Sequence, residues 1–414
     1  MDKTESTESL IAQMLERLRE LQGRALAAEV TEAMTVVPRH MFVPHVPVEK
    51  AYGLGAVVTH WDSEGVATSS ASAPGTVAGM LEQAEVKPGH RVLEIGAGTG
   101  YNAALLAHLV GPSGTVTTIE YDPQVADAAR NALASYGADQ VKVITGDGTL
   151  GAPDDAPFDR ILVTAGAWDV APAWRDQLAP GGRVVLPLRL RGLTRVTAFE
   201  ADGDHLRSVT VNEDGFIPMK GIGSVVEQNI PLGPGPDVTL RVDDEQQVDV
   251  AAFAGVLESE PETIWTDIEA PWAWTENQDL WLATLPGFCR VFVDKDAVAV
   301  GRVPRPKDPW GAWGVHSGAS LAYLTARRVG GVDEMPMLQI GATGFGPDGA
   351  RLAQQLVDRA IDWQRDTDGR VQVTIEARPK DGLPITGQDD ALAVIDKADH
   401  TFVITTAPLT AATA

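Results

Sequence analysis

Three alternating glycines directly follow a short apolar strand pattern in the first half of the chain. Residues 92–95 form the strand pattern, Gly96, Gly98 and Gly100 follow it, and a helical pattern comes next. Glycine lets the backbone approach a ligand closely, and the N-terminus of the following helix offers unpaired N–H groups. A dinucleotide fingerprint has the spacing G-x-G-x-x-G, but here Tyr101 stands where its third glycine would fall. The turn favours a nucleoside-containing cofactor, although this spacing alone is a weak signal.

Acidic side chains follow the next two predicted strands, at the same edge of the expected sheet. Residues 115–119 are followed by Glu120, about twenty residues after the glycines. At this position a carboxylate can accept two hydrogen bonds from a ribose diol. Residues 141–145 are followed by Asp147, whose carboxylate is placed to read an adenine edge. Each acid taken singly is more simply a solvated loop residue. Together, the three turns predict a nucleoside site.

Strand-like and helix-like patterns alternate from the glycine turn onward. The predicted strands are residues 92–95, 115–119, 141–145, 160–164 and 183–188, and the predicted helices are residues 102–109, 123–135 and 172–178. This alternation predicts an α/β fold with a mostly parallel, doubly wound, Rossmann-like sheet. Two further alternating runs, residues 194–200 and 206–212, predict a terminal antiparallel hairpin.

Ordered motifs over about 150 residues resemble the protein-L-isoaspartate O-methyltransferase family. Besides the glycine turn they are residues 37–44 (VPRHMFVP), 51–52 (AY), 72–74 (SAP), 146–148 (GDG), 157–161 (PFDRI), 164–167 (TAGA) and 177–183 (QLAPGGR). The resemblance implies a carboxyl O-methyltransferase that uses S-adenosyl-L-methionine and releases S-adenosyl-L-homocysteine. It is the resemblance, rather than the glycine spacing, that indicates this cofactor.

The same resemblance assigns roles to individual residues. Ser72 would hold the acceptor carboxylate by a hydrogen bond, with Ser70 beside it on the substrate side, whereas the structural alternative is a serine-rich cap for a helix at residues 76–83. Glu120 would bind the ribose hydroxyls, Asp147 the adenine amino group, and Glu94 would orient the glycine turn. The complete set of expected cofactor contacts is Ala71, Pro74, Glu94, Gly96, Ala97, Gly98, Thr99, Gly100, Tyr101, Asn102, Glu120, Tyr121, Asp147, Gly148 and Thr164.

Composition excludes several classes of partner. The 414 residues carry 33 basic and 57 acidic side chains, a formal net charge of −24, which disfavours nucleic acid and anionic lipid as partners. No run of about twenty apolar residues suggests a membrane span, and the N-terminus lacks a secretory pattern. The single cysteine, Cys289, excludes an intrachain disulfide and a cysteine-rich metal site, and no metal is predicted. We expect a cytoplasmic protein.

The length predicts two domains. Residues 1–230 would form the catalytic domain, with N-terminal helices in residues 1–50, and residues 231–236 a linker. Residues 237–414 would form a second α/β or α+β domain. Six of the ten tryptophans fall between Trp265 and Trp313, which is consistent either with a tryptophan-rich core or with an aromatic groove for a peptide.

The C-terminal region narrows the expected substrate. Its end, residues 393–397 followed by a strand, resembles longer members of the family that are encoded beside lanthipeptides, lasso peptides and graspetides. By that resemblance the acceptor is a specific aspartate of a modified peptide, converted through its methyl ester and a succinimide (aspartimide) to isoaspartate. Two alternatives stay open: a housekeeping repair methyltransferase, and a binding protein without turnover, which the presence of Glu120, Asp147 and Ser72 disfavours.

Overall fold

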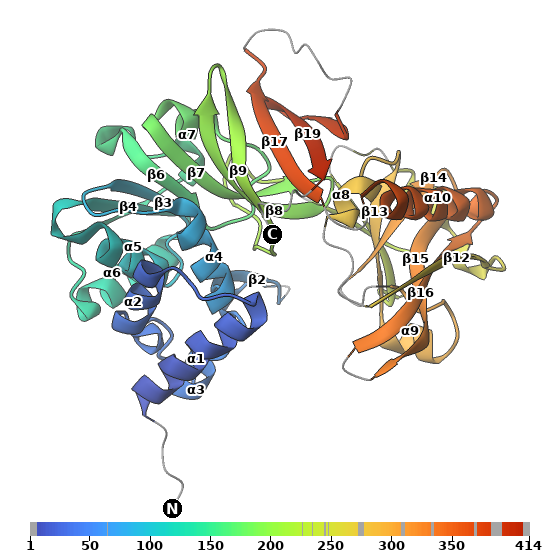
Figure 1. Cartoon of the computed structure of the whole chain (residues 1–414), viewed down its shortest axis with the longest axis horizontal. Helices are drawn as coiled ribbons and strands as arrows, with labels where there is room; N and C mark the ends of the chain where they lie inside the picture. The colour runs from blue at the N-terminus through green and yellow to red at the C-terminus, as the bar shows by residue number, and fades with distance from the viewer. Residues whose placement is uncertain are drawn as a thin grey trace, which may run out of the picture.

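The computed structural model of the chain describes residues 6–63, 65–225, 227–233, 235–243, 246, 248–271, 277–307, 311–332, 335–367, 371–381 and 391–408. Residues 7–213, in blue to green, and residues 228–367, in yellow to orange, form two lobes that stand side by side (Figure 1). None of the helices in the described part of the chain is both long and apolar enough to cross a bilayer.

A large sheet organises the first lobe. Its strands are β3 (Arg91–Ile95), β4 (Thr115–Glu120), β5 (Val141–Thr145), β6 (Phe158–Val163), β7 (Leu178–Leu190), β8 (Leu193–Asp202), β9 (His205–Glu213), β17 (Val371–Pro379), β18 (Ala393–Asp396) and β19 (His400–Pro408). Within the described residues their order is β18-β19-β17-β9-β8-β7-β6-β3-β4-β5. Neighbours from β5 to β7 pair in parallel, and those from β7 to β9 pair antiparallel. The predicted Rossmann-like sheet and its hairpin are confirmed, but the hairpin is not the end of the sheet.

Helices and a small hairpin pack around this sheet. They are α1 (Thr7–Gln22), α2 (Ala28–Val36), α3 (Val48–Ala51), α4 (Pro74–Ala84), α5 (Tyr101–Val110), α6 (Pro123–Tyr136), α7 (Pro172–Asp176), and the strands β1 (Val57–Trp61) and β2 (Ala67–Ala71). Successive side chains of β3 point to opposite faces of the sheet. Val92 belongs to the apolar core that includes residues of α1, α2, α4 and α5, and Leu93 belongs to the core that includes Trp174 of α7. Helix α1 buries Leu10, Ile11, Met14 and Leu18, whereas Leu21 is 72% exposed.

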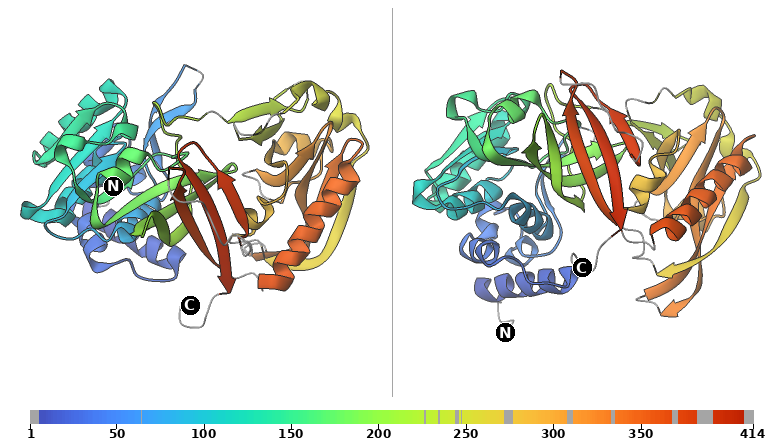
Figure 2. Two further views of the ribbon diagram at one scale, coloured as in Figure 1. Left: turned by 90° about the horizontal axis from the view of Figure 1, so that it is seen from above. Right: turned by 45° about the horizontal axis from the view of Figure 1, so that its top comes forward.

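The second lobe is an antiparallel sheet with a long helix on one face. Its elements are β10 (Gln228–Pro231), β11 (Val238–Val242), β12 (Glu262–Pro271), β13 (Phe288–Val293), β14 (Ala312–Ser317), β15 (Ser320–Val332), β16 (Met335–Phe345), α8 (Gln278–Leu282), α9 (Lys295–Ala299) and α10 (Gly349–Thr367). The orange helix α10 lies along this sheet (Figure 2) and buries Leu352, Leu356 and Trp363 against it. The arrangement is the α+β form of the predicted second domain.

The described tryptophans of the second lobe are buried or half-buried. Trp281 packs edge-on against the fully buried Trp363, with ring centroids 5.6 Å apart, and Trp313 is 8% exposed. The Trp265 ring lies 4.3 Å beneath the Arg327 guanidinium. These contacts favour the core alternative over the aromatic groove. Trp272, Trp274 and Trp310 lie outside the described residues.

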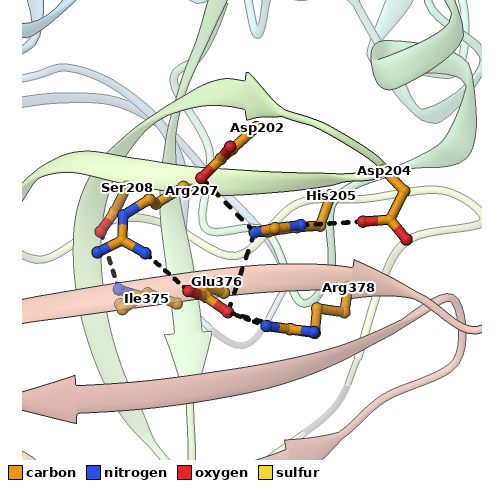
Figure 3. A network of polar contacts seen from close by, with 8 residues as sticks. All are labelled: Asp202, Asp204, His205, Arg207, Ser208, Ile375, Glu376 and Arg378. Atoms are coloured by element: carbon orange, nitrogen blue, oxygen red, sulfur yellow. Dashed lines mark hydrogen bonds and ion pairs between the residues drawn. The ribbon is translucent and has the colours of Figure 1, made fainter. Parts of the chain in front are cut away.

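The last strands return to the first lobe. Strand β17 pairs with β9 through Leu206 and Arg207, so the strands β17, β18 and β19 extend the sheet of the first lobe. Figure 3 shows the polar contacts at this junction: the Glu376 carboxylate accepts hydrogen bonds from Arg207, at 2.8 Å, and Arg378, at 2.6 Å. The predicted linker at residues 231–236 begins at the last residue of β10, which already belongs to the second sheet, and β17, β18 and β19 of the predicted second domain pair within the first sheet.

The turn between β18 and β19 is anchored to the loop that follows β6. The Asp169 carboxylate accepts hydrogen bonds from the His400 ring, at 2.9 Å, and from the backbone N–H of Asp399, at 2.9 Å. The Lys397 ammonium donates to the Trp168 carbonyl, at 2.5 Å, and to the Arg189 carbonyl. His400 is fully buried. The C-terminal strands therefore hold a loop whose first residues form part of the candidate site.

Candidate active site

A cavity of ≈ 600 Å³ lies at the carboxyl ends of β3, β4 and β6. Its wall is formed by residues 67–73, the glycine turn, residues 119–122 and the loop after β9, residues 214–220. This volume falls within the range of small-molecule sites in proteins, and the edge of the sheet is where open α/β folds bind their ligands.

The cavity gathers most of the predicted site residues. Those that line it are Ser70, Ala71, Ser72, Gly96, Ala97, Gly98, Thr99, Tyr101, Asn102, Glu120, Tyr121, Gly148 and Thr164. Four predicted residues are not part of the wall: Pro74 begins α4, Gly100 caps α5, Glu94 is fully buried, and the Asp147 carboxylate is hydrogen-bonded to backbone N–H groups. The serines lie close to the glycine turn, since a Cβ on Gly98 would stand 3.5 Å from the Ser70 carbonyl oxygen.

Two glycines of the turn are required by close contacts and backbone angles. Gly96 has φ +100°, and a Cβ there would lie 2.7 Å from the Thr164 hydroxyl, which itself donates to the Gly96 carbonyl at 2.7 Å. Gly100 has φ +83°, and its Cβ would meet Leu133 of α6 at 3.1 Å. L-residues with side chains rarely adopt such φ values. Gly100 therefore serves helix packing rather than the cavity wall.

Glu120 holds the glycine turn and faces the cavity. One carboxylate oxygen accepts the Gly98 N–H at 3.0 Å, and the other accepts the Asp122 N–H at 3.1 Å. Each carboxylate oxygen can accept a second hydrogen bond. Glu120 thus retains the capacity that its predicted role as the ribose acceptor requires.

Glu94 is a buried carboxyl group behind the turn. It accepts hydrogen bonds from the Thr118 hydroxyl, at 2.5 Å, and the Asn102 amide, at 2.8 Å, which link β3, β4 and the first turn of α5. Burial raises the pKa of Glu94 from 4.5 to about 7, against the lowering effect of these two hydrogen bonds. These contacts fit the predicted role of orienting the turn.

We expect Glu94→Gln to change the pH dependence of stability. Because the folded-state pKa is raised, the contribution of Glu94 is fully present below pH 4.5 and is lost as the pH rises through about 7. The wild type should lose about 3 kcal/mol relative to the variant over this window, about 2 of it between pH 5.5 and 8. Denaturant unfolding at several pH values measures the difference, and parallel stability profiles would contradict the assignment.

Asp147 is engaged with the loop after β9. Its carboxylate accepts hydrogen bonds from the backbone N–H groups of Ile222, at 2.7 Å, and Thr149, at 2.9 Å. Burial opposes ionisation, but these hydrogen bonds leave the pKa of Asp147 below its ordinary value. A contact between Asp147 and adenine stays a prediction, because Asp147 is not among the residues that line the cavity, whereas its neighbour Gly148 is.

Sequence reasoning missed the buried residue that holds the Ser72 loop. Arg39 is fully buried, and its guanidinium donates to the carbonyls of Ala51, at 2.9 Å, Ala71, at 3.2 Å, and Ser72, at 2.6 Å. It also lies 5.0 Å from the ring centre of Tyr101. The motif VPRHMFVP contained the signal, since a lone arginine within an apolar segment needs buried acceptors.

The loop after β9 was also missed as part of the site. Residues 214–220 line the cavity, and Gly166 fixes the loop by donating to the Ile217 carbonyl, at 2.8 Å, and accepting from the Met219 N–H, at 2.9 Å. The sequence placed these residues within the predicted catalytic domain, residues 1–230, and assigned them no role in the site. The charged residues of this loop, Asp214 and Lys220, gave no signal because they belong to no motif.

The cavity fits the predicted cofactor. Glycine backbone and an acceptor carboxylate stand at the expected strand ends. Tyr101 also contributes to the wall, and its hydroxyl is buried behind it. Nowhere in the described chain do three or more His, Cys, Asp or Glu side chains gather as a metal site would require.

Comparison with known proteins identifies relatives of the first lobe. Residues 9–222 match the family described as protein-L-isoaspartate(D-aspartate) O-methyltransferase. The protein-L-isoaspartate O-methyltransferase of Methanopyrus kandleri is 43% identical over 217 residues, covering 50% of this chain and 90% of that protein. Protein-L-isoaspartate O-methyltransferase 2 of Archaeoglobus fulgidus is 37% identical over 228 residues, covering 53% and 95%. A solved protein-L-isoaspartate O-methyltransferase is similar over 88% of this chain and 96% of its own, with 20% identity and a TM-score of 0.49.

Proposed function

The chain belongs to the protein-L-isoaspartate(D-aspartate) O-methyltransferase family, and from that premise we propose that its acceptor is an aspartate side chain of a ribosomally made, modified peptide. It is a carboxyl O-methyltransferase with S-adenosylmethionine as its cofactor. The convergence of Glu120, the glycine turn and Ser72 on one cavity supports methyl transfer at this site, and the second lobe is the observation that carries the proposed acceptor.

The reaction asks for alignment more than for acid–base chemistry. S-adenosylmethionine, when bound, supplies an electrophilic methyl group. The acceptor carboxylate is already an anion at neutral pH, so no strong general base is needed. The backbone of the glycine turn would hold the methionine end of the cofactor and Glu120 its ribose. Ser72 would hold the acceptor by a hydrogen bond, and the enclosing walls would exclude water.

The ester made here leads on to isoaspartate. The neighbouring backbone nitrogen attacks the ester carbonyl, methanol leaves, and a succinimide closes. Water then opens this ring to aspartyl and isoaspartyl products. A tailoring enzyme would use this sequence to install an isoaspartate or aspartimide in one product, in a cytoplasmic setting where the precursor is made.

The C-terminal region supports the tailoring role over general repair. A repair enzyme must accept any exposed isoaspartate, which gives it little use for a second lobe. Here the chain builds such a lobe and returns to the catalytic sheet through β17. We propose that this lobe recognises the peptide, with the three cavity serines Ser69, Ser70 and Ser72 nearest the acceptor.

Housekeeping repair is the second candidate. It is favoured by the family match and by relatives of 43% and 37% identity that are named protein-L-isoaspartate O-methyltransferases. The two roles differ in kcat/KM for a plain isoaspartyl peptide and for the modified precursor peptide encoded beside the gene. Preference for the precursor by about a hundredfold or more would support tailoring. Equal or better use of the plain peptide would support repair and overturn the proposed substrate.

We expect Ser72→Ala to slow turnover while keeping cofactor affinity. Loss of one hydrogen bond to a charged group, worth about 1.5–3 kcal/mol, should lower kcat/KM by about tenfold to a hundredfold. Steady-state kinetics and calorimetry with S-adenosylhomocysteine measure the two quantities. The exposed Ser113→Ala is the matched control. Full activity of Ser72→Ala would remove this serine from the mechanism.

A further inference from the structure

The cavity carries an unusual balance of charge. Of the described residues that line it, Glu120, Asp122 and Asp214 are carboxylates, and Lys220 is the one with a cationic side chain. The whole chain has a net charge of −24. An acceptor carboxylate entering such a site loses hydration and meets like charges, which is costly unless a cation pairs with it. Lys220 has the charge that this acceptor requires.

The lining carboxylates accept hydrogen bonds from backbone N–H groups, whereas the Lys220 ammonium group makes no such contact with the described residues. Asp122 accepts the Gln124 N–H at 2.9 Å, and Asp214 accepts the Gly215 N–H at 2.7 Å. Glu120 holds the two backbone N–H groups described above. No hydrogen bond or ion pair joins the half-buried Lys220 ammonium to another residue in the described ranges. It is therefore available to a ligand.

The backbone on both sides of Lys220 is fixed. Before it, the buried Met219 donates its N–H to the Gly166 carbonyl at 2.9 Å. After it, the Asp147 carboxylate accepts the Ile222 N–H at 2.7 Å. Gly221 has φ +91°, and a Cβ there would lie 2.3 Å from the Asp147 carboxylate, so only glycine allows this approach. These contacts hold the backbone at Lys220 in place beside the cavity.

We propose that Lys220 binds the acceptor carboxylate of the peptide and that Asp147 is the positioning residue of its loop. This inference rests on the proposed function, since it names the group that recognises the acceptor of that reaction. The ligand chemistry is a carboxylate, and the alternative source of one is the methionine end of the cofactor. The acceptor is favoured because the glycine turn already offers backbone N–H groups to the methionine end.

The charge change in the reaction predicts which kinetic constant Lys220 controls. One acceptor oxygen forms a bond to the methyl carbon, and the electron pair of the broken methyl–sulfur bond stays on sulfur. The acceptor passes from an anion to a neutral ester, so its attraction to an ammonium group weakens along the reaction. Lys220 therefore stabilises the bound substrate more than the transition state, and its removal should raise KM rather than lower kcat.

Kinetics of Lys220→Met and Lys220→Arg test the proposal. For Lys220→Met we expect KM for the acceptor peptide to rise by about tenfold to a hundredfold, the effect of losing a charge-assisted hydrogen bond. We expect kcat and the affinity for S-adenosylhomocysteine to stay within about twofold. Lys220→Arg should restore most of the KM, and the exposed Lys87→Met should change neither constant. A comparable fall in S-adenosylhomocysteine affinity would place Lys220 at the methionine carboxylate and overturn the proposal.

A binding experiment separates this proposal from the proposed function. The full chain, saturated with S-adenosylhomocysteine, is titrated with each acceptor peptide and with the same peptide carrying a carboxamide in place of the acceptor carboxylate. The wild type should prefer the carboxylate form, and Lys220→Met should lose that preference. Equal preference in both proteins, or none in either, would refute the role of Lys220. A preference without any methyl transfer would instead refute the proposed function alone.

Asp147→Asn distinguishes a positioning role from adenine recognition. The variant keeps one acceptor oxygen but weakens the hold on the Ile222 N–H. If Asp147 positions Lys220, KM for the acceptor should rise by a smaller factor than in Lys220→Met, with S-adenosylhomocysteine affinity retained. A fall in that affinity with an unchanged KM would assign Asp147 to the adenine and remove it from the Lys220 loop.

Discussion

Replacing Glu120 by alanine should lower the affinity for S-adenosylmethionine by about a hundredfold or more. The ribose diol would lose two charge-assisted hydrogen bonds, worth about 1.5–3 kcal/mol each. In addition, the N–H groups of Gly98 and Asp122 would lose their acceptor, which loosens the turn that forms the cavity wall. The combined loss, about 3–6 kcal/mol, corresponds to about 10²- to 10⁴-fold in the dissociation constant.

Calorimetry with S-adenosylmethionine and S-adenosylhomocysteine measures this effect. Glu120→Gln, which keeps the shape and one acceptor oxygen but loses the charge, should fall between the wild type and Glu120→Ala. The exposed Glu49→Ala is the matched control and should bind as the wild type does. Unchanged affinity in Glu120→Ala would show that the cofactor site has been placed wrongly.

Replacing Asp169 by alanine should lower the free energy of unfolding by about 3 kcal/mol, because several donors lose one acceptor and an unsatisfied buried polar group costs about 1–3 kcal/mol. The His400 ring and the backbone N–H groups of Val170, Asp399 and His400 would lose their shared acceptor. His400 has no route to water in compensation, because it is fully buried. The effect should be large because this carboxylate joins the C-terminal turn to the catalytic lobe.

Equilibrium unfolding in denaturant, monitored on the full chain, measures the Asp169 effect. Asp139→Ala, which removes an exposed carboxylate, should change stability little. A change of less than about 1 kcal/mol in Asp169→Ala would mean that the C-terminal strands are not an energetic part of the catalytic lobe. The strands β17, β18 and β19 would then contact the catalytic lobe without stabilising it.

The strands of the catalytic sheet could be predicted because each one is marked by the residues within it and directly beside it. The strands β3 to β6 are runs of five or six residues separated by helical patterns, and the sequence found the apolar part of the longer β7. The glycine turn requires its glycines at 96 and 100 because of their φ angles and close contacts. Glu120 could be placed for the same reason, since a residue that directly follows a parallel strand must lie at the ligand-binding edge. The resemblance then supplied what spacing could not, the cofactor and Ser72.

Contacts between distant segments were beyond the sequence. The pairing of β17 with β9 joins residues about 170 positions apart. The residue pattern of one strand does not indicate which other strand it pairs with. The same holds for Arg39, whose acceptors Ala51, Ala71 and Ser72 are backbone carbonyls and have no side-chain signature. Lys220 could be recognised as a candidate site residue only from the structure, which places its loop at the cavity.

Mass spectrometry of the acceptor peptide after incubation with the enzyme and S-adenosylmethionine tests the central claim most directly. The account predicts a gain of one methyl group on a carboxyl oxygen, followed by its loss as methanol when the succinimide closes, and neither change with Glu120→Ala. It further predicts that the modified precursor peptide, rather than a plain isoaspartyl peptide, is the substrate so changed. A wild-type enzyme that methylates neither peptide, or that leaves a methyl group which never departs as methanol, would contradict the account.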